Sequence, residues 1–347
     1  MATMTHRQRG LTTIRDVAAA AGVSIGTASK ALRGQGSLRD ETRLRVREAA
    51  DRLGFRPNDL AQSLHRKKSF TVGLLSNDSY GRFTIPLLEG IEQSLASAGV
   101  SVFVCNAFDD TAREEKLIDS LLSKRVDGII VTSRRTDPRT AVDLHNAGVP
   151  LLYAFTRVQS EEAFCLVPDD LGGARLGVEH LIKNGRRRIA HISGPERFES
   201  VRLRRDAYQA VLQEHGLPHD SSKVLIGAWS ESWGHEAVAK LFGGGATGHD
   251  IDAIFCGSDQ IARGVVDALR ERGVRVPQDV AIVGFDNWEI VAAATRPPLT
   301  TIDMNLQELG REAGSAVLSM IDGGHRTGTI RIPCKLVVRD SCGGRAS

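Results

Sequence analysis

The chain has few aromatic residues, few cysteines and no long apolar run. Aromatic side chains make up 5% of its 347 residues, and the five cysteines include no Cys-x-x-Cys pair. This scatter argues against a zinc site or a disulfide framework. No apolar stretch approaches the roughly 20 residues of a membrane-spanning helix. The opening residues, MATMTHRQRG, lead into a polar segment rather than an apolar signal core. We therefore expect a cytoplasmic protein without membrane contact, metal or cofactor.

Charge is distributed unevenly along the chain. Residues 1–68 contain 14 lysines and arginines against 6 aspartates and glutamates, a net charge of +8. Residues 69–347 contain 31 against 36, a net charge of −5, so the overall +3 conceals a polarised molecule. A basic segment on an acidic body favours contact between one end of the chain and phosphate groups.

The segment 12–33 predicts two short helices joined by a tight turn. It reads TTIRDVAAAAGVSIGTASKALR. Thr13 and Asp16 form a Thr-x-x-Asp pair that caps the first helix, and apolar residues recur at helical spacing over 14–21. An alanine-rich helical hairpin without a DNA-binding function gives a similar pattern, so the surroundings of the segment decide between the two interpretations.

The turn and the second helix favour DNA binding. Gly22 supplies the backbone freedom that a sharp turn needs, and Ser24 can cap a helix over 25–32. Such a pair is typical of the helix-turn-helix, whose second helix lies in the major groove with its N-terminal residues against base edges. The positions that face bases and phosphates in this arrangement are Ile25, Gly26, Thr27, Ser29 and Lys30.

A third helix completes a small core. Asp40 and Glu41 mark its start and Gly54 its end. We expect its inner face to consist of Leu44, Ala49, Ala50 and Leu53.

Residues 55–69, FRPNDLAQSLHRKKS, differ in character from both neighbours. Pro57 ends the preceding structure, Asn58 can cap a short helix, and a basic run follows at 65–68. A solvated linker is one interpretation. Beside a DNA-binding unit we favour a short helix that inserts an apolar side chain into the minor groove while cations hold the phosphates, with Leu64 as the wedge.

From residue 70 onward, short apolar runs alternate with amphipathic helical stretches. One series starts at FTVGLL and ends at VPLLYAF, and a second starts near Ala163 and ends at VAIVGFD. Each series predicts βαβ units around a parallel sheet. Two such series predict two lobes, with a ligand between them at the carboxyl ends of the strands.

The residues that follow the apolar runs are chemically mixed. They are Asn77, Phe155, Arg202, Arg204, Trp229, Ser258, Asp259 and Asp286. Arg204 can donate two hydrogen bonds to hydroxyls or a carboxylate, Asp286 can accept from two hydroxyls, and Trp229 offers a flat face for a ring. Helix capping and core packing are common alternatives for such an aspartate or tryptophan. As a group, the side chains suit a small polyol.

Over nearly its whole length the chain resembles the LacI/GalR family of bacterial transcription regulators. The matching stretches are DVAAAAGVSIGTASKAL, RPNDLAQSL, RLGVEHLIKNGRRRIAHISGP, FCGSDQIARGVVDALRERGVRVPQDVAIVGFD and PPLTTI. The resemblance implies an all-α helix-turn-helix head over 1–57, a hinge helix and linker over 58–68, and a two-lobed α/β core with parallel sheets, like that of periplasmic sugar-binding proteins, over 69–347. It implies a repressor that binds a palindromic operator in double-stranded DNA as a homodimer, controlled by a small-molecule effector of the carbohydrate class. The short polar tail after Val338 favours a dimer over a tetramer.

Individual positions acquire roles from the helix pattern and the resemblance together. The residues expected on DNA are Thr13, Ser24, Ile25, Gly26, Thr27, Ser29, Lys30 and Arg33 of the head and Asn58, Ala61 and Leu64 of the hinge. Those that the resemblance places in the effector pocket are Asn77, Phe83, Phe155, Arg204, Trp229, Ser258 and Asp286. Ser258 stands where relatives often have asparagine, and Phe155 where some have a carboxylate. We therefore expect a pocket less polar than a typical sugar site.

Two other classes of function stay open. A transport-type solute-binding protein shares the core, although the basic head and the missing signal peptide count against it. An enzyme on this scaffold needs a coherent nucleophile, base and metal set, and we find none, so no catalytic residue is expected. The GVSIG stretch at 22–26 matches G-x-S-x-G but has no strand before it.

Overall fold

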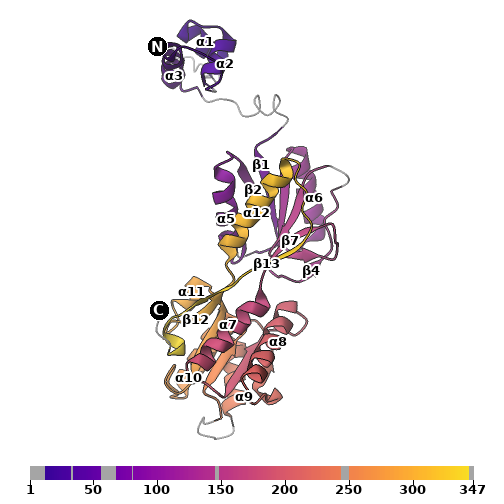
Figure 1. Ribbon diagram of the computed structural model, residues 1–347, viewed down its shortest axis with the longest axis vertical. Coiled ribbons are helices and arrows are strands. Elements are labelled where there is room, and N and C mark those ends of the chain that lie inside the picture. The colour runs from indigo at the N-terminus through magenta and orange to yellow at the C-terminus, as the bar shows by residue number, and fades with distance from the viewer. Residues whose placement is uncertain are drawn as a thin grey trace, which may run out of the picture. The chain divides into compact units, whose positions relative to one another are not determined.

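The computed structural model describes residues 12–32, 34–55, 68–79, 81–144, 148–243 and 250–343 (Figure 1). The chain divides into two compact units, residues 1–69 and 70–347. Within the described ranges, no helix combines the length and the apolar character that a membrane span requires.

The described residues of the first unit contain three helices: α1 (Ile14–Ala21), α2 (Ile25–Leu32) and α3 (Asp40–Arg52). The bounds of α1 and α2 confirm the sequence prediction. Their shared core consists mostly of alanine and valine, which lets short helices pack closely without large side chains. It comprises Val17, Ala18, Ala21, Ala28, Ala31, Val46, Ala49 and Ala50.

The inner face of α3 differs from the prediction. Val46, Ala49 and Ala50 are buried, at the three- and four-residue spacing of one helical face. Leu44 is 59% exposed because it lies two residues before Val46, on the opposite side of the helix. Leu53 follows the last helical residue and is 38% exposed. The predicted core roles of these two leucines were wrong.

The first lobe of the core contains a six-stranded parallel sheet in the order β13-β7-β5-β3-β1-β2. Its strands are β1 (Thr71–Ser76), β2 (Ser101–Asn106), β3 (Gly128–Thr132), β5 (Leu151–Ala154), β7 (Phe164–Pro168) and β13 (Gly328–Ile332). Two apolar clusters cover its faces, one with α5 (Thr84–Ala96) and α12 (Leu306–Ile321), the other with α6 (Thr111–Ser123). A two-stranded ladder joins β4 (Pro138–Arg139) to β6 (Arg157–Val158).

The second lobe repeats this design with the order β14-β12-β11-β10-β8-β9, in which only β14 is antiparallel to its neighbour. The strands are β8 (Ile189–Ser193), β9 (Val224–Ile226), β10 (Ala253–Cys256), β11 (Ala281–Asp286), β12 (Thr300–Asp303) and β14 (Lys335–Val337). The helices are α7 (Asp170–Lys183), α8 (Glu199–Glu214), α9 (Glu231–Phe242), α10 (Asp259–Glu271) and α11 (Glu289–Ala292), with 3-10 turns η1 (Ser221–Lys223) and η2 (Asp340–Cys342). Apolar clusters bury both faces of this sheet as well.

The chain passes between the lobes three times. Strand β7 of the first lobe leads directly into α7 of the second, β12 leads back into α12, and β13 leads forward to β14 (Figure 1). The two-lobed α/β core with parallel sheets, predicted from the alternating apolar runs, is confirmed.

Candidate nucleic-acid interface and interlobe pocket

The turn between α1 and α2 is closed by local hydrogen bonds. Gly22 adopts a left-handed conformation (φ 62°), which a residue without a Cβ accommodates readily. Thr13 donates its backbone N–H to the Asp16 carboxylate (2.7 Å) at the start of α1. At the start of α2, Ser24 Oγ accepts from the N–H of Thr27 (3.1 Å). These bonds satisfy amides that the helix ends leave free and fix the angle at which α2 leaves the turn.

Helix α2 has one anchored face and one free face. Ala28 and Ala31 are fully buried in the head core. Ile25 is 47% exposed, and Gly26 and Lys30 are exposed with it. The anchored alanines hold the helix while the outer face remains available to a partner.

Other residues predicted on DNA are placed as follows. Thr13 and Ser24 are exposed, and Thr27 and Ser29 are half-buried. Four predicted contacts lie outside the described residues: Arg33, Asn58, Ala61 and Leu64.

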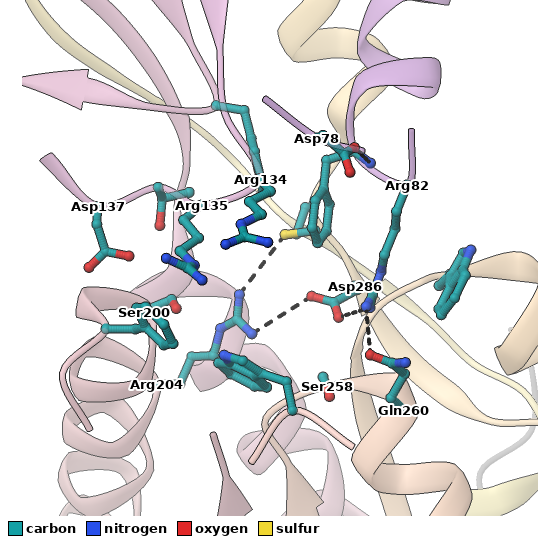
Figure 2. Close-up of a pocket in the computed structure, with 17 residues that line it drawn as sticks. Asp78, Arg82, Arg134, Arg135, Asp137, Ser200, Arg204, Ser258, Gln260 and Asp286 are labelled. Atoms are coloured by element: carbon teal, nitrogen blue, oxygen red, sulfur yellow. Dashed lines mark hydrogen bonds and ion pairs between the residues drawn. The ribbon is translucent and has the colours of Figure 1, made fainter. Parts of the chain in front are cut away.

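A cavity of about 380 Å³ lies between the two lobes of the core (Figure 2). The first lobe contributes residues that follow β1, β3 and β5: Asp78, Arg82, Phe83, Arg134, Arg135, Thr136, Asp137 and Phe155. The second contributes residues from α8, the start of α10 and the ends of β9, β11 and β12: Phe198, Ser200, Arg204, Trp229, Ser258, Gln260, Asp286, Trp288 and Met304. This is the location in which open parallel sheets bind ligands.

Arg204 lies in the wall of the cavity with its hydrogen bonds largely made. It belongs to α8 and is 4% exposed. Nε and Nη2 donate to Asp170 Oδ1 (2.8 and 2.5 Å), and Nη1 donates to the carbonyl of Gly257 (2.6 Å). The guanidinium stacks 3.5 Å from the ring centroid of Phe285. Arg204 is therefore part of the structural framework as well as a lining residue.

Asp286 sits between two arginines. Its carboxylate accepts from Arg82 of the first lobe, and its other oxygen lies 3.7 Å from Arg204 (Figure 2). Burial raises the pKa of Asp286, while the charges of Arg82 and Arg204 lower it. Behind it, Asp259 accepts from the Thr301 hydroxyl (2.6 Å), and burial and the Asp286 charge raise the pKa of Asp259.

Two aromatic pairs border the cavity. Phe83 and Phe155 stack in the first lobe with centroids 4.8 Å apart, and Phe198 and Trp229 stack in the second at 6.5 Å. Such faces suit the apolar side of a sugar or a planar ring. The wall of the interlobe cavity thus combines charged side chains with the flat faces of aromatic rings.

Hydrogen bonds join the lobes at two edges of the cavity. Arg82 donates to Gln260 Oε1 (3.1 Å) as well as to Asp286. At the other edge, Asp137 accepts from the N–H of Glu199 (2.7 Å), and Arg157 forms a bidentate ion pair with the Glu199 carboxylate. Hydrogen bonds and ion pairs between the lobes therefore stabilise the arrangement that the structure shows.

Of the predicted pocket residues, Phe83, Phe155, Arg204, Trp229, Ser258 and Asp286 border the cavity. Ser258 is the N-cap of α10, where its hydroxyl accepts from the N–H of Ile261 (3.3 Å). Asn77 borders a second hollow in the first lobe, and its Oδ1 accepts from the N–H of Arg134 (3.0 Å). It thereby positions the loop after β3.

Sequence reasoning missed most of the charge in the pocket. Four arginines and three aspartates line it, and the expected lower polarity relative to a typical sugar site stays a prediction. Arg134, Arg135 and Asp137 immediately follow the β3 run GIIVT. Asn77 and Asp286 were selected because they follow apolar runs. The same criterion, applied to the residues that follow β3, identifies these charged side chains as well.

Two family descriptions match the chain. "Bacterial regulatory proteins, lacI family" matches residues 13–58, and "Periplasmic binding protein-like domain" matches residues 178–342. The regulatory-protein description covers the three-helix unit. The binding-protein description covers most of the second lobe, together with α12 and β13 of the first lobe.

Individual proteins match over most of their length. Catabolite control protein A of Priestia megaterium is 32% identical over 87% of this chain and 90% of its own. The ribose operon repressor of Escherichia coli K12 is 31% identical over 90% and 93%. Among solved structures, the lac repressor dimer bound to operator and the anti-inducer ONPF superposes with a TM-score of 0.77, at 28% identity over 96% of this chain and 99% of that one.

Proposed function

The chain belongs to the lacI family of bacterial regulatory proteins, and from that membership we propose that it represses transcription by binding a specific DNA operator under the control of a small molecule. The outer face of α2 carries the proposal. Buried Ala28 and Ala31 hold the helix in the head, and Ile25, Gly26 and Lys30 are left exposed on a unit of net charge +8.

In this function α2 lies in the major groove. Ile25 makes apolar contact with a base edge, Gly26 permits close approach of the backbone, and Lys30 donates to an acceptor such as O6 or N7 of guanine. Thr13, Ser24, Thr27 and Ser29 contact phosphates. The roles of Arg33, Asn58, Ala61 and Leu64 stay predictions from the sequence.

In a homodimer, the second copy of the chain brings a second α2 helix to the DNA. The core exposes large apolar side chains on β2, α5 and α11: Phe103 (47%), Val104 (50%), Ile85 (65%) and Ile290 (77%). Strand β2 is also the edge of its sheet. Covering these side chains with a second copy removes them from water and, by two-fold symmetry, sets two α2 helices on a palindromic operator.

The interlobe cavity is the effector site of this proposal. Its lining comes from both lobes, so a ligand bound there contacts groups whose separation depends on the lobe arrangement. A ligand that fits one arrangement better shifts the population toward it and thereby changes operator affinity.

A transport-type solute-binding protein is not proposed, because residues 13–58 match the lacI family of bacterial regulatory proteins and the relatives of this chain include the ribose operon repressor. We propose that the chain is not an enzyme, since those relatives regulate transcription. Binding to chromosomal DNA places it in the cytoplasm.

Selection of DNA by the full chain tests the function. From a random duplex library, we expect enrichment of a palindrome with two half-sites, with retention that weakens as salt increases. Enrichment of no sequence above the starting library, with and without a panel of sugars and sugar phosphates, would overturn the proposal.

A further inference from the structure

The four arginines of the interlobe pocket differ in how their charges are balanced. Arg82 pairs with Asp286, and Arg204 pairs with Asp170, in contacts whose side chains are at most 15% exposed. These two arginines are thus neutralised within the protein. Arg134 and Arg135, which follow β3, have no buried carboxylate partner among the described residues.

The pairing of Arg134 is weak. Its partner is Asp109 at 2.6 Å, and the two side chains are 42% and 40% exposed, so solvent screens the interaction. Arg135 makes no ion pair and no hydrogen bond with the described part of the chain. The charged groups that act on its pKa are Arg134, Arg197, Asp109 and Asp137.

The carboxylate of Asp137, two residues after Arg135, is committed to a contact with the second lobe. Asp137 Oδ1 accepts from the N–H of Glu199 (2.7 Å) at the first turn of α8, and Oδ2 is buried without a partner among the described residues. It therefore does not bond Arg135. Among the described residues, this acceptor oxygen therefore has no donor and the Arg135 guanidinium has no acceptor, although both residues line the same pocket.

Arg135 is held in place before any ligand arrives. Its guanidinium lies 4.4 Å from the centroid of the Phe198 ring, and Arg197 lies 4.5 Å from the same ring. Arg135 is exposed overall, and the partial burial of its guanidinium together with the charge of Arg134 lowers its pKa. Figure 2 shows Arg134, Arg135 and Arg204 entering the cavity from two sides. A stacked guanidinium loses little freedom on binding, which favours an anionic partner.

We propose that the molecule bound in this pocket carries an anionic oxygen group, a phosphate or a carboxylate, that Arg135 and Arg134 bind. The proposal rests on the proposed function only in taking this cavity as the effector site. The stacked aromatic pairs then contact the ring of the same molecule. A charged sugar derivative fits this chemistry better than a neutral sugar does.

Inorganic phosphate is the minimal probe of the arginine pair. The melting temperature of the full chain is measured in increasing phosphate against chloride at equal ionic strength, for wild type, Arg135→Gln, Arg134→Gln and a control, Arg113→Gln. Arg113 is also exposed and stacks on a phenylalanine, Phe108 at 4.8 Å, but does not line the cavity.

We expect phosphate to stabilise the wild type and the Arg113 variant alike, with an apparent affinity about tenfold weaker in Arg135→Gln and a smaller loss in Arg134→Gln. Circular dichroism verifies that each variant is folded. Equal stabilisation of all four proteins would show a general salt effect and overturn the proposal.

Organic probes separate the two anion sources. Glucose 6-phosphate, glucuronate and glucose are titrated in the same way. Tighter binding of glucose 6-phosphate than of inorganic phosphate identifies a phosphate ester as the anionic group. Tighter binding of glucuronate than of inorganic phosphate identifies a carboxylate. Glucose binding as tightly as both, and unaffected by Arg135→Gln, would overturn the proposal. DNA selection is measured separately. Its failure contradicts the proposed function, whereas the anion proposal is tested by the titrations alone.

Discussion

Replacing Arg204 with methionine tests whether the buried ion pair behind the pocket holds the second lobe together. The side chains of Arg204 and Asp170 are 5% and 2% exposed. Methionine is similar in length and fills the site without a charge. The change leaves the Asp170 carboxylate buried and without its partner, and it removes the donor of the Gly257 carbonyl (2.6 Å).

The size of the effect follows from these two losses. Removing one member of a buried ion pair typically costs about 3–5 kcal/mol. An unsatisfied buried carbonyl costs about 1–3 kcal/mol, but the two losses share one side chain and do not add in full. We expect the free energy of unfolding to fall by about 3–5 kcal/mol in total.

The assay can isolate the core unit within the full chain. The three tryptophans are Trp229, Trp233 and Trp288, all in the second lobe, so urea unfolding followed by tryptophan fluorescence reports on that lobe. Adding Asp170→Asn to Arg204→Met removes the unpaired charge and should recover a large part of the loss. Asp170→Asn alone should cost less, because Arg204 keeps the Gly257 carbonyl and the nearby Asp286. A loss below about 1 kcal/mol for Arg204→Met, or no recovery in the double variant, would refute this reasoning.

Three further predictions concern the head and the second-lobe core. Lys30→Ala should cost about 1–3 kcal/mol of operator binding and relax base preference at one position of each half-site, as measured by fluorescence anisotropy on operator variants; a uniform loss on every sequence would mean a phosphate contact instead. Gly26→Ala should stabilise the head by up to about 1 kcal/mol, because an added Cβ lies 3.8 Å from its nearest neighbour, Ser24 Oγ, yet weaken operator binding; unchanged binding contradicts close approach at Gly26. Burial lowers the pKa of His191 from 6.5 to about 4, so the unfolded chain binds the extra proton and the free energy of unfolding falls as pH drops from about 6.5 to 4, by up to about 3 kcal/mol. His191→Phe should flatten that part of the pH profile in urea unfolding, and an equally steep profile would assign the acid sensitivity to other groups.

The helix pair and the two sheets could be predicted because local signals agree with the tertiary structure. Thr13, Gly22 and Ser24 act through bonds within a few residues, so the sequence near each one determines its role. Inner strands such as β3 and β10 are buried on both faces, which makes them continuous apolar runs. The prediction for Leu44 was wrong because Leu44 lies about 200° around the helix from the buried Val46, which places this apolar side chain on the outer face.

The chemistry of the pocket was harder to predict because it depends on partners distant in sequence. Arg204 looked free to bind hydroxyls, yet it is bonded to Asp170, 34 residues away. Asn77 and Asp78 are consecutive, but Asp78 borders the interlobe cavity and Asn77 the hollow beside it. Neither pattern nor composition specifies which of two adjacent polar residues enters a cavity when the turn after a strand sets their directions.

The positions of the charged groups determine which ligands can act on the lobes. Arg82 of the first lobe bonds Asp286 of the second, so a ligand hydroxyl that competes for Asp286 weakens a tie between the lobes. Arg135 belongs to the first lobe but rests on Phe198 of the second. A ligand that reaches both Asp286 and Arg135 senses the separation of the lobes at both edges of the pocket, and its affinity differs between their arrangements. A ligand held by one lobe alone binds every arrangement equally and shifts no population, however tightly it binds. With this pocket as the proposed effector site, a molecule that spans it from Arg135 to Asp286 meets the requirement for controlling DNA binding.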